Sequence, residues 1–185
     1  MRLPHHWPPH KAVRAAKSEL SPLMKKMSLP PLVLDIRDGN VTWQRLDNLN
    51  YELLGYFLSC HLIIEHYLDE YLKTRYPELD WNASRQTFGQ KVSLLATDNY
   101  PEKYNSIPAI KHLNSLRNKL SHNIDFKIGS VDLLPLSHYL KKCCGPEFED
   151  PTEPKEILDL FTSMVCVWFA SGISSTARQT RHTRG

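Results

Sequence analysis

Four polar residues near the middle of this 185-residue chain could together bind an anion and transfer a proton: Arg117, Asn118, Ser121 and His122. On an α-helix, residues four apart lie one above the other, so Asn118 would lie one turn from His122. Arginine is always charged, and its planar fork matches phosphate oxygens. Histidine titrates near neutral pH and can take up or release a proton. The stretch therefore predicts a site that binds a phosphate group and transfers a proton beside it.

The same stretch has the apolar pattern of an amphipathic helix. Leu113, Leu116 and Leu120 recur at steps of three and four residues, which predicts a helix from about residue 109 to residue 123. The pattern also fits a helix end without chemistry, in which a solvated histidine suits the helix dipole. Both interpretations of the polar sector are open from the pattern alone.

Further helices are predicted from apolar patterning at 46–76, 85–97, 135–142 and 152–172. The first is long enough to be the main pillar of a bundle. The last is apolar on almost every side, which places it at the centre of the protein or against a second copy. The side chains expected to cap helix starts are Asp47 or Asn48 for the first helix and Ser84 for the second. The expected fold class is therefore all-α.

One acidic residue, Glu65, stands among apolar neighbours in the long helix. A carboxylate is rarely buried without a partner. If it faces the core, Arg117 is a candidate partner. The alternative places it on the solvent edge, near Asp69 or Lys73.

The ends of the chain differ from its middle. Residues 1–45 are proline-rich and basic, and an Asp-Gly-Asn turn between apolar, β-branched runs predicts a hairpin over 32–43 that packs against helices. Residues 173–185 are basic and are expected to be a disordered tail. The predicted organisation is an N-terminal extension, a helical domain over 46–172 and this tail. Basic ends suit a polyanion, and they also fit tails that only solubilise.

Composition indicates a cytoplasmic protein. The chain has 41% hydrophobic residues and four cysteines without a CxxC pair, which fits free thiols in a reducing compartment. No secretory signal is visible, and no apolar run approaches the length of a membrane span. We therefore expect no contact with a membrane.

Two clusters contain residue types that can bind a metal, but neither has the pattern of a metal site. The histidines at 5, 6 and 10 lie in an irregular segment without supporting groups, and Cys143–Cys144 with His138 lacks a second pair of ligands. His61, His66 and His112 are expected to be ordinary helical residues. No metal and no cofactor is expected.

From about residue 46 to residue 171 the chain resembles the HEPN superfamily of small helical-bundle proteins. The family motif is an arginine, a polar residue, and a histidine after four to six intervening residues. The residues that match it, with four between the arginine and the histidine, are Arg117, Asn118 and His122. The other similar positions are Ile110, Leu113, Leu116 and Glu65. The resemblance implies an up-and-down bundle of four to five helices.

The resemblance also implies a metal-independent endoribonuclease whose site forms where two motifs meet across a homodimer. His122 would be the general base or acid, Arg117 would hold the scissile phosphate and Asn118 would position them. The residues implied for substrate binding or support are Ser121, Lys119 and, as an orienting partner of Arg117, Glu65. The substrate would be RNA, and the protein would be a toxin or defence effector with an antitoxin or defence-system partner.

One position departs from the family. In the toxins that a nucleotidyltransferase regulates, a tyrosine stands two residues after the histidine, whereas this chain has Ile124. Control by modification at that position is therefore not expected. Some members of the superfamily keep the fold and only bind RNA or a nucleotide, or serve as adaptors. A non-catalytic module of that kind is the alternative function, and a purely structural helical dimer is a third.

Overall fold

The computed structural model describes five ranges of residues: 30–45, 49–81, 83–95, 101–123 and 125–182. The chain divides into two compact units, Met1–Leu49 and Asn50–Gly185. The predictions for the histidines near the N-terminus, for caps at Asp47 and Asn48, and for Ile124 lie outside the described residues.

The described part of the first unit is the predicted hairpin. Strand β1 (Leu32–Arg37) pairs antiparallel with β2 (Asn40–Gln44). Asp38 and Gly39 have φ of 51° and 78°, the left-handed pair that a two-residue hairpin turn of type I′ requires. Within this unit most apolar side chains of the two strands are exposed, and Leu32 is half-buried. The packing of the hairpin against helices stays a prediction.

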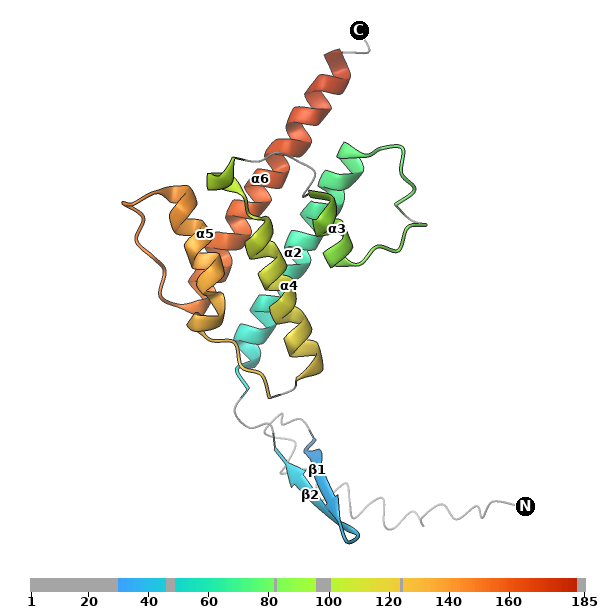
Figure 1. Cartoon of the computed structure of the whole chain (residues 1–185), viewed down its shortest axis with the longest axis vertical. Coiled ribbons are helices and arrows are strands. Elements are labelled where there is room, and N and C mark those ends of the chain that lie inside the picture. The colour runs from blue at the N-terminus through green and yellow to red at the C-terminus, as the bar shows by residue number, and fades with distance from the viewer. Residues whose placement is uncertain (1–29, 46–48, 82, 96–100, 124, 183–185) are drawn as a thin grey trace, which may run out of the picture. The chain divides into compact units, whose positions relative to one another are not determined.

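The second unit is a helical bundle (Figure 1). Its helices are α2 (Tyr51–Arg75), α3 (Phe88–Leu95), α4 (Ile107–His122), α5 (Leu134–Cys144) and α6 (Pro154–His182). The largest fully buried side chains of its core include Phe57, Ile64, Leu68, Ile110, Leu113, Leu116, Phe161 and Phe169. These come from α2, α4 and α6, and α3 and α5 add Leu95 and Leu136 to the same core, so all five helices enclose it. The mostly helical class with a small hairpin agrees with the patterning.

The first two helices begin later than predicted. Asn50 caps α2, because its side chain accepts a 2.9 Å hydrogen bond from a backbone N–H of the first turn. Thr87 and Gln90 cap α3 reciprocally, each side chain accepting from the other's backbone N–H at 3.3 and 2.8 Å. The prediction of Ser84 as the cap is wrong, since its hydroxyl donates to a preceding backbone carbonyl instead.

The expected up-and-down order fails at the last step, because α5 and α6 run in the same direction. Ser130 contacts Thr152 and Tyr139 packs on Phe161, and both pairs are 22 residues apart. The connection over 145–153 can span roughly 30 Å when extended. It therefore has enough length to return along α5, which is only about 16 Å long.

Helix α6 is also parallel to α2, with which it shares the longest contact of the unit. At one end Tyr56 Oη donates to Asp159 Oδ1 at 2.9 Å, and further along the Tyr71 ring lies 5.4 Å from that of Phe169. One face of α6 is buried by this contact, whereas Val167 on another face is exposed. The helix is thus apolar on more sides than the bundle covers.

The predicted end of the last helix near Gly172 is wrong, because α6 continues to His182. A Cβ at position 172 would lie 2.5 Å from Cε2 of Tyr71, so this glycine permits a close approach of α6 to α2. The residues that follow include alanine, arginine and glutamine, which are good helix formers. Residues 173–182 are therefore helical and not a disordered tail.

By length and composition, Pro154–Gln179 of α6 is the one helix in the described ranges that could cross a membrane. Of its most apolar window, 33% is buried inside the bundle. A helix that packs along α2 needs the same apolar composition, so this property alone does not assign a membrane role.

Candidate functional site

The predicted polar sector lies on the last turns of α4. Arg117, Asn118, Lys119, Ser121 and His122 are all exposed. Their exposure follows from the amphipathic pattern, because Leu113 and Leu116 are buried on the opposite side of the helix. The sector is therefore accessible to a ligand without any change in the core.

Only part of the sector is joined by side-chain contacts. Arg117 Nη1 donates to Asn118 Oδ1 over 3.5 Å, a long hydrogen bond. Lys119 Nζ lies 5.6 Å from the centre of the Phe126 ring, and Ser121 Oγ donates to the Arg117 carbonyl. Within the described residues no side chain hydrogen-bonds to the imidazole of His122. Asn118 thus contacts Arg117 and does not orient His122.

A pocket of about 770 Å³ opens beside Arg117 and Asn118, between α2, α3 and α4. Glu65 lines the same pocket, as the prediction of a shared site requires. Lys119, Ser121 and His122 are not among its described lining residues. The structure therefore brings three of the six predicted site residues to one cavity and leaves His122 outside it.

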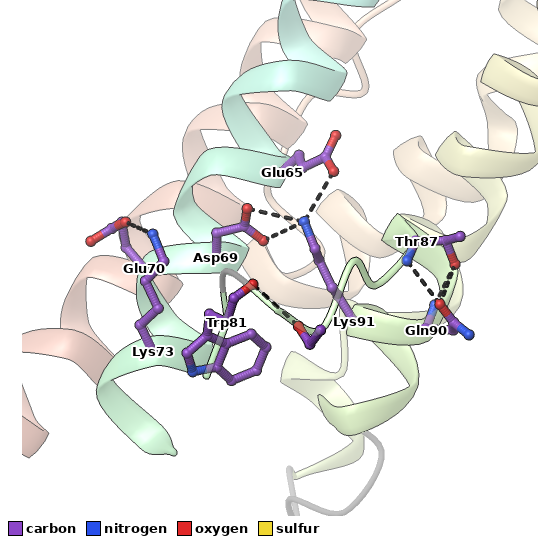
Figure 2. A network of polar contacts seen from close by, with 9 residues as sticks. Glu65, Asp69, Glu70, Lys73, Trp81, Thr87, Gln90 and Lys91 are labelled. Carbon is purple, nitrogen blue, oxygen red and sulfur yellow. Dashed lines mark hydrogen bonds and ion pairs between the residues drawn. The ribbon is translucent and has the colours of Figure 1, made fainter. Parts of the chain in front are cut away.

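The ion-pair partner of Glu65 is Lys91 of α3, which neither sequence interpretation named (Figure 2). Lys91 Nζ lies 3.3 Å from Glu65 Oε1 and 2.7 Å from Asp69 Oδ1. Burial opposes the charge of Lys91, but hydrogen bonds and charges of the two carboxylates outweigh it and raise its pKa. Arg117 is therefore left free of a carboxylate partner in the described structure.

His61, expected from the sequence to be an ordinary helical residue, lines the pocket and is a candidate site residue. It is only 4% exposed and lines the pocket with Asn114. Its Nε2 lies 3.4 Å from Asn114 Oδ1, and its ring centre lies 4.4 Å from that of Phe88. The available signal was spacing, because His61 and Glu65 are one helical turn apart on α2.

Burial sets the protonation state of His61. It lowers the pKa of the imidazole below its usual value, and the charge of Arg117 lowers it further. The hydrogen bond with Asn114 and the charge of Glu65 oppose this shift without cancelling it. The imidazole is therefore neutral at neutral pH. Because an amide oxygen only accepts, Nε2 donates and Nδ1 keeps its lone pair.

The described ranges contain no group of three or more His, Cys, Asp or Glu residues arranged to hold a metal ion. The Cys143 thiol donates to the Lys103 carbonyl at 3.3 Å. The groups that converge at the pocket are the Arg117 guanidinium, two amides, an imidazole, the Thr87 hydroxyl, the ion-paired carboxylate of Glu65 and apolar side chains. That set suits an organic ligand with an anionic group.

No family model matches the chain, and no match to it was found among the curated proteins or the solved structures. The HEPN resemblance therefore stays a prediction that depends on the residues of α2 and α4.

Proposed function

We propose that this chain is a metal-independent endoribonuclease of the HEPN type that acts as a homodimer. The observation that carries the proposal is the exposed end of α4, where Arg117 has no carboxylate partner and His122 has no hydrogen-bond partner among the described residues. Both groups are available to a phosphodiester.

The chemistry requires two functions that these side chains supply. Attack of a ribose 2′-oxygen on the adjacent phosphorus needs a base to remove its proton, and the departing 5′-oxygen needs an acid. The negative charge on the phosphorane needs a cation, and the fork of Arg117 matches it. The products are a 2′,3′-cyclic phosphate and a free 5′-hydroxyl.

A second copy completes the site in this proposal. Each α4 end presents one imidazole, whereas cleavage uses a base and an acid. Two chains that meet at this end would supply two histidines and two arginines to one phosphate. A cytoplasmic toxin or defence effector, restrained by a partner protein, is the setting that this activity fits.

The test is cleavage of RNA by purified protein in the presence of EDTA. Arg117→Ala and His122→Ala should each reduce cleavage by about 100-fold or more. The matched control is His138→Ala, because this exposed histidine of α5 lies outside the site. Equal inactivity of wild type and His122→Ala would contradict the proposal.

The alternative is a module that binds RNA or a nucleotide without cleaving it. One observation favours it: His122 lies outside the pocket that Arg117 and Asn118 line. In this case RNA would bind and remain intact, Arg117→Ala would weaken binding, and His122→Ala would leave it unchanged. Fluorescence anisotropy with labelled RNA, run beside the cleavage assay, separates the two functions.

A further inference from the structure

The pocket combines apolar walls with polar groups of defined direction. Leu58, Leu62 and Phe88 supply apolar surface, while Asn114 and Asn118 supply amides. Its volume of about 770 Å³ lies within the range of roughly 300–1,000 Å³ that is usual for small-molecule sites. The pocket is therefore large enough for a nucleotide-sized ligand.

The polar groups form a series that leads from the cation into the buried part of the pocket. Asn118 is adjacent to Arg117 and hydrogen-bonds with it, and Asn114 lies one turn earlier on α4. Asn114 in turn contacts the buried ring of His61. An anionic group at Arg117 would thus place the rest of its ligand against amides and a neutral imidazole.

The charge of the pocket also restricts the ligand. Its carboxylate, Glu65, shares Lys91 with Asp69, and this lysine has only 14% of its side chain exposed. Arg117 is the lining cation without such a partner in the described structure. A ligand with one anionic group and a neutral, planar polar body matches this distribution.

Gly89 of α3 keeps one wall of the pocket open. A Cβ at this position would lie 3.8 Å from Asn114 Nδ2, which is an ordinary contact, so a larger side chain would extend toward Asn114. Its φ is not in the left-handed region, and a substitution there is not strained by the backbone. The position can therefore be used to fill the pocket.

We propose that this pocket is a nucleobase subsite, in which the base of a nucleotide whose phosphate contacts Arg117 is held by Asn114, Asn118 and His61. Amides pair with the hydrogen-bonding edges of bases, and apolar side chains cover their faces. The assignment of the phosphate to Arg117 rests on the proposed function. The base contacts rest on the pocket itself.

The first test fills the pocket from Gly89. Nucleoside 5′-monophosphates should bind wild type at least 10-fold more tightly than ribose 5-phosphate does, measured by calorimetry. Gly89→Leu should remove this difference and leave ribose 5-phosphate binding unchanged, with Gly89→Ala falling between. The matched control is Gly55→Leu, an exposed glycine of α2 whose Cβ would meet nothing within 4 Å. Thermal melts of each variant would check that it is folded.

The second test changes the polar edge without changing its shape. Asn114→Asp removes one pair of N–H donors and adds a negative charge, so it should weaken binding of all four mononucleotides and also alter their ranking and that of RNA cleavage sites. Equal binding of mononucleotides and ribose 5-phosphate to wild type would overturn the base subsite. Absence of RNA cleavage alone would contradict the proposed function and not the base subsite. Base-dependent binding of mononucleotides without cleavage would still support the subsite.

Discussion

The exposed end of α4 and the pocket beside it are built in opposite ways. Arg117 and His122 are exposed and have few described contacts, so their neighbours do little to determine their state. His61 is buried against Phe88 and Asn114, and its neighbours determine both its charge and its tautomer. The end of α4 can therefore be altered without cost to the fold, whereas a change at the buried His61 also changes the packing of the bundle.

The largest expected effect would separate activity from stability at the exposed end. Arg117→Ala should reduce RNA cleavage by about 100-fold or more. Its free energy of unfolding should change by no more than about 0.5 kcal/mol, because surface substitutions seldom cost more. Cleavage assays and urea unfolding measure the two quantities. A large loss of stability would contradict the interpretation that the exposed end of α4 contributes little to the stability of the fold.

The next effect concerns the ion pairs that support the pocket. Lys91→Met leaves Glu65 and Asp69 half-buried without their counter-charge, and should cost about 1–3 kcal/mol in the free energy of unfolding. Lys73→Met is the control, because its pair with Glu70 is exposed and is worth about 1 kcal/mol or less. Equal costs in urea unfolding would mean that Lys91 is no more than a surface residue.

A pair of glycines extends the same contrast to the long helices. Gly172→Ala should destabilise by about 1–2 kcal/mol, since its Cβ would overlap the Tyr71 ring, which must shift. Gly55→Ala should instead stabilise by about 0.5–1 kcal/mol, because this exposed position of α2 has space for a methyl group. Thermal unfolding of both variants measures the difference. A gain in stability for both variants would contradict the close approach of α6 to α2 at Gly172.

The smallest expected effect is the contribution of His61 to the pH dependence of the free energy of unfolding. Burial lowers the pKa of the folded imidazole below its usual 6.5, so the unfolded chain takes up a proton first as the pH falls. Stability should therefore decrease as the solution is acidified below about pH 6.5. His61→Phe should reduce that decrease, whereas His138→Ala should leave it in place. Unfolding curves between pH 7.5 and about 5 test this, and identical slopes for wild type and His61→Phe would contradict it.

Local signals predicted most of the elements. The Asp-Gly-Asn turn predicted the hairpin, and the leucine spacing before Arg117 predicted a helix over about 109–123, where α4 spans Ile107–His122. These predictions succeeded because turn geometry and helical periodicity depend on residues only a few positions apart. The same locality explains the failures at Ser84 and Gly172. A serine can cap a helix or bond to another backbone group, and a glycine can end a helix or permit close packing inside one. The residue type alone does not distinguish these roles.

Local sequence patterns were enough to predict the helical class, the hairpin and the polar sector with Arg117, Asn118 and His122, because each depends on near neighbours along the chain. The pairing of Lys91 with Glu65, the burial of His61 beside Asn114 and the pocket next to Arg117 became visible only in the folded bundle. Those contacts join α2 to α3 and α4 across tens of residues. Which helix faces meet across such separations in the chain depends on the packing of the whole bundle, so local patterns do not predict it.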